Sequence, residues 1–353
     1  MADGDQLDLF GGPSGGRGGL APAAVDADTR AIAERLPPEV YLGTSSWSFP
    51  GWSGLVYRDL ASEAVLARRG LGAYAAHPLF ATVGVDRTFY APVEADVLAD
   101  YAAAVPDRFR FLVKAHEALT LARYPQHARY GAQRGQDNPR LFDVGWARDQ
   151  VVAPYVEGLG AKAGVLLFQF PPQPAELYGG PRRFSERLYR FLRDLPRGPR
   201  YAVEVRTAEL LTKDTAACLR AVGAAPCLAA MPGLPPVDVQ WRALGGGDAD
   251  LLVVRWLLAA HHDYDSARAA YAPFSRLVEP DPSTRTTIAR LIRAAHARGT
   301  PSFIIANNKA EGSSPLTLRE LARELVGGLA DPEPAAEPSA IDPGDPGADE
   351  IPF

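Results

Sequence analysis

The chain has 353 residues, of which 47% are hydrophobic, and a formal net charge of −5. No apolar run approaches the roughly 18 residues that span a bilayer, and the acidic, glycine-rich N-terminus differs from a secretory signal, so we expect a cytoplasmic protein. The two cysteines, Cys218 and Cys227, can supply neither a disulfide framework nor a four-ligand zinc site, and we interpret them as buried packing residues.

The charge is unevenly distributed. Residues 1–36 carry a net −3 and residues 331–353 a net −7, which leaves +5 for residues 37–330 out of the total of −5. A mildly basic body with acidic tails is compatible with a polyanionic partner but does not require one.

The first 36 residues are rich in Gly, Ala, Asp and Pro, which is typical of a disordered tail. Within them, Gln6-Leu7-Asp8-Leu9-Phe10 resembles the short motif by which many bacterial replication and repair proteins bind the DNA sliding clamp. In such a motif Leu7, Leu9 and Phe10 would be apolar anchors and Gln6 a polar pin. We therefore predict the sliding clamp as a partner. The alternative is a stray apolar patch in a tail.

From Pro37 onward, short apolar runs alternate with helix-like segments. We predict strands over residues 41–45, 79–86, 109–114, 164–169, 201–206, 226–230, 251–255 and 302–307. We predict helices over residues 62–76, 94–104, 141–159, 182–194, 208–222, 283–298 and 315–328, with a weak helix between 236 and 245, a loop at 256–282 and Ser283 as a helix cap. This alternation predicts an α/β fold, a single TIM-like (β/α)8 barrel over 37–330, between disordered tails at 1–36 and 331–353.

The predicted strands end on polar residues. Side chains alternate between the two faces of a strand, so Glu204 and Arg206 would lie on the opposite face from Val203 and Val205. Active sites of parallel barrels lie at the C-terminal ends of the strands. The mouth of the barrel is therefore expected to collect Asp86, Lys114, Gln169, Glu204, Arg206, Arg255 and Asn307, with Ser46 and Trp47 above the first strand.

Several motifs occur in the order found in one known family. They are Gly43–Trp47, Thr82–Tyr90, Phe111–Ala115, Leu167–Pro172, Tyr201–Arg206 and Asn307-Asn308. On these residues the chain, over roughly 40–328, resembles the DUF72 (YecE-like) family. The resemblance implies a TIM-like barrel and does not imply a particular reaction.

The chain departs from the family pattern at two places. The family usually has Glu-Ile/Val-Asn-Ser-Thr-Phe-Tyr where this chain has Val85-Asp86-Arg87-Thr88-Phe89-Tyr90. It usually has Arg-Leu-His-Gly where this chain has Arg255-Trp256-Leu257-Leu258. The role of the family histidine is therefore not carried over.

The residues of the mouth could serve hydrolysis. Glu204 or Asp86 would be the general base, and Lys114, Arg206 and Arg255 would hold a phosphate or stabilise negative charge. A pair of carboxylates flanking a glycosidic bond is also possible, as are buried ion pairs that only close the barrel. Side chains expected to stack on or bind a substrate are Trp47, Trp52, Phe89, Tyr90, Gln169 and Asn307.

The segment 115–140 follows a strand and should overhang the mouth. Its arginines, among them Arg123 and Arg129, alternate with tyrosines, which suits a phosphate backbone with stacked bases. A solvated loop is the alternative. No cofactor is indicated, and we expect no metal site, because His261-His262-Asp263 has adjacent histidines and no other metal-like spacing.

The chain ends Asp349-Glu350-Ile351-Pro352-Phe353, which resembles the C-terminus of bacterial single-stranded-DNA-binding proteins. There the terminal Phe enters a pocket and its carboxylate meets a basic residue. The sequence as a whole favours a DNA-associated hydrolase, nuclease- or glycosylase-like, that is recruited to the clamp. Two alternatives are a sugar or sugar-phosphate enzyme with incidental tails and a non-catalytic clamp adaptor.

Overall fold

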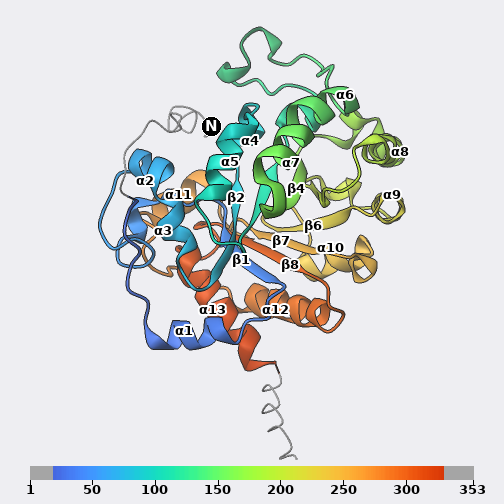
Figure 1. Ribbon diagram of the computed structural model, residues 1–353. Helices are drawn as coiled ribbons and strands as arrows, with labels where there is room; N and C mark the ends of the chain where they lie inside the picture. The colour runs from blue at the N-terminus through green and yellow to red at the C-terminus, as the bar shows by residue number, and fades with distance from the viewer. Residues whose placement is uncertain (1–18, 330–353) are drawn as a thin grey trace, which may run out of the picture.

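The eight predicted strands form one closed parallel barrel, in the order in which they occur along the chain. The computed structural model describes residues 19–329, and Figure 1 shows the strands at its centre. The predicted TIM-like barrel is therefore confirmed. The strands are β1 (Val40–Thr44), β2 (Phe80–Val85), β3 (Arg110–Lys114), β4 (Ala163–Phe170), β5 (Tyr201–Val205), β6 (Ala225–Ala230), β7 (Leu252–Trp256) and β8 (Ser302–Ala306).

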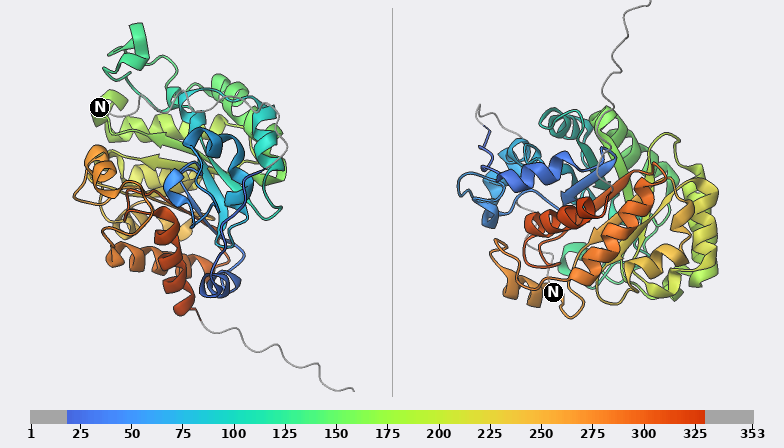
Figure 2. Two further views of the ribbon diagram at one scale, coloured as in Figure 1. Left: turned by 90° about the vertical axis from the view of Figure 1, so that its left-hand side faces the viewer. Right: turned by 90° about the horizontal axis from the view of Figure 1, so that it is seen from below.

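Helices surround the barrel, as the further views in Figure 2 show. No helix in the described part of the chain is long and apolar enough to cross a lipid bilayer. The α-helices are α1 (Ala27–Glu34), α2 (Glu63–Arg69), α3 (Leu71–Ala75), α4 (Arg87–Tyr90), α5 (Ala95–Ala103), α6 (Val144–Ala147), α7 (Ala153–Leu159), α8 (Gly180–Asp194), α9 (Lys213–Val222), α10 (Val237–Ala243), α11 (Tyr264–Tyr271), α12 (Pro282–His296) and α13 (Ser314–Gly327).

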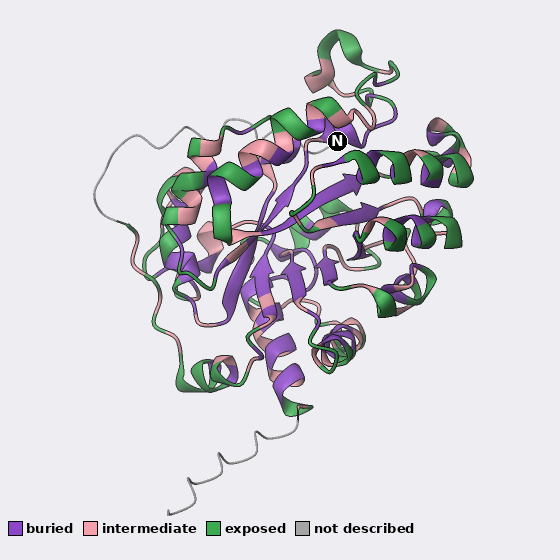
Figure 3. Ribbon diagram, turned by 45° about the vertical axis from the view of Figure 1, so that its right-hand side comes forward, coloured by how far each residue is buried: buried purple, intermediate pink, exposed green. Residues whose placement is uncertain are grey.

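The apolar core lies on both faces of the strands. Inside the barrel, Tyr41 and Phe303 stack with ring centroids 4.5 Å apart, and the same cluster contains Leu112, Leu167 and Val253. A larger cluster joins the outer strand faces to the helices. Figure 3 shows the result, with buried strands and helices whose exposed faces point outward. This division is what the two-residue period of a strand requires.

The N-terminal segment is more structured than expected, because α1 lies within residues 1–36. Asp26 caps this helix by accepting a hydrogen bond from the Thr29 backbone N–H at 2.7 Å. Arg319 and Arg323 of α13 then form ion pairs with Asp28 at 3.0 and 2.7 Å. The partners of α1 are almost 300 residues away, so composition alone could not reveal them.

Two expectations around the last crossover are wrong. The segment 256–282 is not only loop, because Asp263 and Ser266 form a reciprocal cap that begins α11. The cap of the next helix is Asp281, which accepts from the Thr284 N–H at 3.0 Å, and Ser283 lies inside α12. Pro282 takes the first helical position, where its missing N–H is not needed.

Three predicted helices are interrupted. The helix expected at 62–76 divides at Gly70 into α2 and α3, and the one expected at 208–222 begins with a separate turn at Ala208–Leu210 before α9. The helix expected at 141–159 begins at Val144 and contains a wide turn over Arg148–Val152. That turn comes just before Pro154, which has no N–H to donate. Hydrophobic periodicity locates these helices but not their interruptions.

Gly43 allows β1 and β2 to approach closely where their register shifts. A Cβ at this position would lie 1.9 Å from the carbonyl oxygen of Thr82. We expect Gly43→Ala to lower the free energy of unfolding by about 2–3 kcal/mol in denaturant titrations, because backbone atoms cannot move aside. Gly247→Ala is the matched control, since a Cβ there meets no atom within 4 Å. Equal losses in both variants would contradict the steric explanation.

Candidate active site

The predicted mouth residues turn toward the barrel axis at the C-terminal ends of the strands. On β5, Ala202 belongs to the inner apolar cluster, whereas Val203 and Val205 belong to the outer one, so Glu204 faces inward. Leu112 and Val253 are also inner residues, two positions before Lys114 and Arg255. The alternation expected from the sequence is therefore present in the fold.

Glu204 is at the centre of this site and is completely buried. Arg206 Nε donates to its Oε1 at 2.5 Å, and Arg255 Nη1 donates to its Oε2 at 2.7 Å. Arg255 Nη1 also donates to Gln169 Oε1 at 3.1 Å, and the thiol of Cys227 lies 3.7 Å from Glu204 Oε2. Two guanidinium groups thus compensate one carboxylate that has lost all contact with solvent.

Asp86 is the second acid of the site. Lys114 Nζ lies 3.3 Å from Asp86 Oδ2, and Arg255 Nη2 lies 3.8 Å from Asp86 Oδ1. The side chains of Asp86 and Arg206 are 26% and 18% exposed, whereas those of Lys114 and Arg255 are almost fully buried. A molecule that enters the mouth would therefore reach Asp86 and Arg206 first.

The electrostatic environment shifts the pKa values of the titratable groups in different directions. Burial alone would raise the pKa of Glu204, but Arg206 and Arg255 outweigh it and lower the pKa to about 2. Burial lowers the pKa of Lys114 to about 8, although Asp86 acts in the opposite direction. Burial also raises the pKa of the Cys227 thiol well above its usual range. Near neutral pH, Glu204 stays charged and Cys227 stays protonated.

Two buried atoms of the site have no hydrogen-bond partner within the described residues. They are Asp86 Oδ1 and Arg255 Nε. Buried polar atoms in folded proteins nearly always have a partner, and unpaired ones are often found at functional sites. An acceptor on Asp86 and a donor on Arg255 therefore remain for water or a ligand.

The rim next to β1 and β8 contains the predicted Asn307 and a residue that we did not predict, Ser45. Asn307 Nδ2 donates to Ser45 Oγ at 2.9 Å, and Asn307 Oδ1 accepts from the Lys309 N–H at 3.0 Å. Ser45 follows β1 directly, so the rule of polar strand ends could have found it. The signal was missed because we extended that strand by one residue, to Ser45, and placed Ser46 and Trp47 beyond it.

The aromatic residues expected to stack on a substrate are mostly inside the fold. Trp47 is 4% exposed and its indole donates to the Ala67 carbonyl at 3.2 Å. Trp52 is fully buried and donates to Asn308 Oδ1 at 3.2 Å. Phe89 lies under the Lys114 ammonium, 4.8 Å from ring centroid to Nζ. Of this group Tyr90 is half-buried.

The arginine-rich segment 115–140 projects from the body next to α6 in Figure 1. Arg129 points inward, where it contacts Glu117 at 2.6 Å and lies over the ring of Tyr90 at 4.9 Å. Arg123 lies farther out, 46% exposed, and pairs with Asp137 at 2.7 Å. The two predicted contact arginines thus occupy different environments.

Three possible metal ligands come together among the described residues, and they lie after β7 rather than in the mouth. They are His261, His262 and Glu279. Asp263, which the sequence placed beside the histidines, caps α11 instead. Glu279 lies 17 residues after His262 in the chain, so the sequence spacing gave no signal for it.

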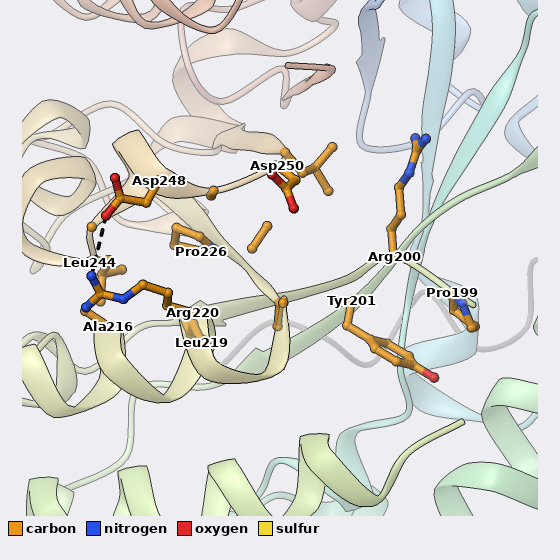
Figure 4. A pocket seen from close by; sticks show the side chains of 16 residues that line it. Pro199, Arg200, Tyr201, Ala216, Leu219, Arg220, Pro226, Leu244, Asp248 and Asp250 are labelled. Atoms are coloured by element: carbon orange, nitrogen blue, oxygen red, sulfur yellow. Dashed lines mark hydrogen bonds and ion pairs between the residues drawn. The ribbon is translucent and has the colours of Figure 1, made fainter. Parts of the chain in front are cut away.

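A separate cavity of about 240 Å³ lies at the other end of the barrel (Figure 4). Its walls include Arg200, Tyr201 and Pro226, near the starts of β5 and β6, and Arg220 there approaches Asp248 at 3.5 Å. In barrels of this type the N-terminal ends of the strands serve stability and the C-terminal ends carry catalysis. We therefore place the candidate active site at the mouth.

The sequence profile of a family described as "Protein of unknown function DUF72" matches residues 41–339. No curated protein matches the chain. The N-terminal motif Gln6–Phe10 and the C-terminal Phe353 lie outside the described residues, and the partners predicted for them stay predictions.

One solved structure supports the fold. It is a DUF72 family protein from Thermotoga maritima MSB8 with 20% sequence identity and a TM-score of 0.52, and the match covers 81% of this chain and 98% of the other. A DUF72 family protein from Enterococcus faecalis V583 has 15% identity and a TM-score of 0.49, over 81% and 95% of the two chains. SacUVDE has 10% identity and a TM-score of 0.42, over 81% and 98%, which carries no information about function.

The lowered pKa of Glu204 predicts a pH-dependent stability. Because its folded-state pKa lies below the unfolded value of about 4.5, the carboxylate stabilises the fold above that pH, and the contribution is lost as the pH falls toward 2. We expect Glu204→Gln to lower the free energy of unfolding at pH 7 by about 3 kcal/mol. Denaturation of both proteins at a series of pH values measures this difference.

The exposed Glu209→Gln is the matched control and should have little effect at any pH. A deficit for Glu204→Gln that stays constant from pH 7 to pH 3 would show that its charge is not what stabilises the barrel.

Proposed function

We propose that this chain, which belongs to the DUF72 family, is a hydrolase that cleaves phosphodiester bonds in DNA. The observation that carries the proposal is that Oδ1 of Asp86 has no hydrogen-bond partner among the described residues, although this partly exposed carboxylate lies next to two buried cations. Such an arrangement offers a base for water and positive charge for a phosphate in one place.

Asp86 is a better candidate for the general base than Glu204. A general base must exchange protons near the working pH and must reach the water molecule that it activates. Glu204 has a pKa lowered to about 2, is fully buried and is held by two arginines. We therefore assign Glu204 the positioning of Arg206 and Arg255.

In the proposed reaction, water displaces the leaving oxygen from phosphorus. The oxygen of water forms a bond to phosphorus while its proton passes to Asp86, and the bond between phosphorus and the leaving oxygen breaks. Lys114, whose pKa of about 8 leaves it protonated at neutral pH, returns a proton to the leaving oxygen. Arg206, and Arg255 behind it, stabilise the charge that develops on the phosphoryl oxygens.

Several features favour DNA over a small phosphate ester. The body of the chain carries a net charge of +5 between its acidic tails, which suits a polyanion. The projecting segment 115–140 adds exposed arginines, among them Arg123 and Arg134. A sugar or sugar-phosphate enzyme is the second candidate, but the burial of Trp47 and Trp52 removes the stacking surfaces that sugars use.

We expect the full chain to cleave damaged, single-stranded or duplex DNA, and we expect Asp86→Asn to lower the rate at least about a hundredfold while DNA affinity persists. Arg206→Ala should weaken DNA binding and reduce its salt dependence. The wild-type rate should decline above pH 8 as Lys114 loses its proton. Gel assays of cleavage and titrations at several salt concentrations measure these effects.

Arg220→Ala, at the opposite end of the barrel, is the matched control and should behave like the wild type. Thermal stabilisation by a sugar phosphate, together with the absence of cleavage of any DNA, would favour the sugar-phosphate candidate. Intact cellular function of Asp86→Asn would favour the third possibility, a non-catalytic adaptor.

We also propose that Gln6–Phe10 recruits the chain to the bacterial sliding clamp, with Leu7, Leu9 and Phe10 as apolar anchors. The acidic C-terminus that ends in Phe353 would be a second attachment point for a DNA-replication partner. Both proposals rest on the sequence of the terminal segments.

Binding of purified clamp to the full chain tests the first of these proposals. We expect Leu9→Ala/Phe10→Ala to reduce clamp affinity more than about tenfold, since two buried apolar side chains are lost. The deletion of residues 331–353 is a control and should leave clamp binding unchanged. If the double variant binds as well as the full chain does, residues 6–10 are not the clamp motif.

A further inference from the structure

The connection between β7 and α12 brings two histidines and one carboxylate together. His261 Nε2 lies 2.7 Å from Glu279 Oε2, and His262 Nε2 lies 3.3 Å from the same oxygen and 3.4 Å from Oε1. All the ligand atoms of the three residues lie within 4.8 Å of one another. These residues have no part in the proposed hydrolysis at the mouth.

The two ring nitrogens of His262 have different neighbours. Its Nδ1 lies 3.1 Å from Ser266 Oγ, which also donates to the Asp263 carbonyl at 3.2 Å. Its Nε2 faces Glu279 and is the nitrogen that an ion shared with this carboxylate would meet.

Tyr271 supports the carboxylate of this cluster by donating to Glu279 Oε2 at 2.7 Å. His262 Nε2 and the two oxygens of Glu279 face each other at 3.3–3.4 Å. Ligand atoms about 2.0–2.1 Å from one tetrahedral ion lie about 3.3–3.4 Å apart, so the two side chains are spaced to share an ion.

We propose that His261, His262 and Glu279 bind one divalent transition-metal ion of the zinc class. Two imidazoles and one carboxylate form a ligand set of catalytic zinc sites, which keep a fourth position for water or substrate. Ser266 and Tyr271 provide the outer hydrogen bonds that orient such ligands. The His261 side chain is 66% exposed, so an ion can enter from solvent.

The proposed ion site lies on a connection at the C-terminal end of the barrel. The histidines follow the C-terminal end of β7, and Ala259 of the same connection donates to the Lys309 carbonyl after β8. An ion bound here would hold this connection against the segment before α12. The connection itself lies at the end of the barrel where loops bind substrates.

Isothermal titration of the full, untagged chain with Zn²⁺ tests the proposal at neutral pH. We expect one ion per chain, and a loss of affinity of at least about tenfold in both His262→Ala and Glu279→Gln. Ser266→Ala should also weaken binding, because it removes the hydroxyl next to His262 Nδ1 that orients the ring. Mg²⁺ should not bind at the same concentrations, since imidazole ligands favour zinc.

His296→Ala is the matched control, because His296 contacts Glu39 with no third ligand beside them among the described residues. The proposal is overturned if the wild type binds Zn²⁺ no more tightly than Glu279→Gln, or if His296→Ala loses as much affinity. Circular dichroism of each variant separates loss of a ligand from loss of the fold, and the result does not depend on DNA cleavage.

Discussion

Glu204 carries a full negative charge inside the barrel, and the fold must provide for it. A buried carboxylate costs several kcal/mol unless it is paired. Its partners are Arg206, two residues further along the chain, and Arg255, two strands away on β7. The ion pair with Arg255 therefore forms only when β5, β6 and β7 are in the observed register, in which Glu204 is opposite Cys227 and Arg255 is opposite Ala229. A slip by one residue would turn each charge to the wrong face.

The same constraint gives the two halves of the barrel interior different contents. The half toward the N-terminal ends of the strands is filled by stacked Tyr41 and Phe303 and by aliphatic side chains, which need no hydrogen-bond partners. The half toward the C-terminal ends contains charged side chains that pair with one another, and two of their atoms, Asp86 Oδ1 and Arg255 Nε, have no hydrogen-bond partner among the described residues. Asp86 Oδ1 is the atom on which the proposed hydrolysis depends.

The carboxylates in the two polar regions at the C-terminal end of the barrel have different hydrogen-bond partners. In the mouth, guanidinium groups donate to Glu204 and bring positive charge with them, so no ion is required. After β7, the partners of Glu279 are His261, His262 and Tyr271. Arginines close the network around Glu204, whereas imidazole nitrogens are groups that can bind a metal ion together with a carboxylate, as we propose for Glu279.

The sequence by itself determined the barrel fold and the strand face on which its charged side chains lie. Apolar runs that end on polar residues identify the strands, and alternation places Glu204 and Arg206 on the inner face, because a strand has a strict period of two. Tertiary structure decided the rest: the burial of Trp47, the inward turn of Arg129, the docking of α1 on α13 and the meeting of Glu279 with two histidines. Local periodicity determines which face of a strand a residue is on. Contacts between loops depend on how the closed barrel brings segments together that are far apart in the sequence, and no local pattern encodes such contacts.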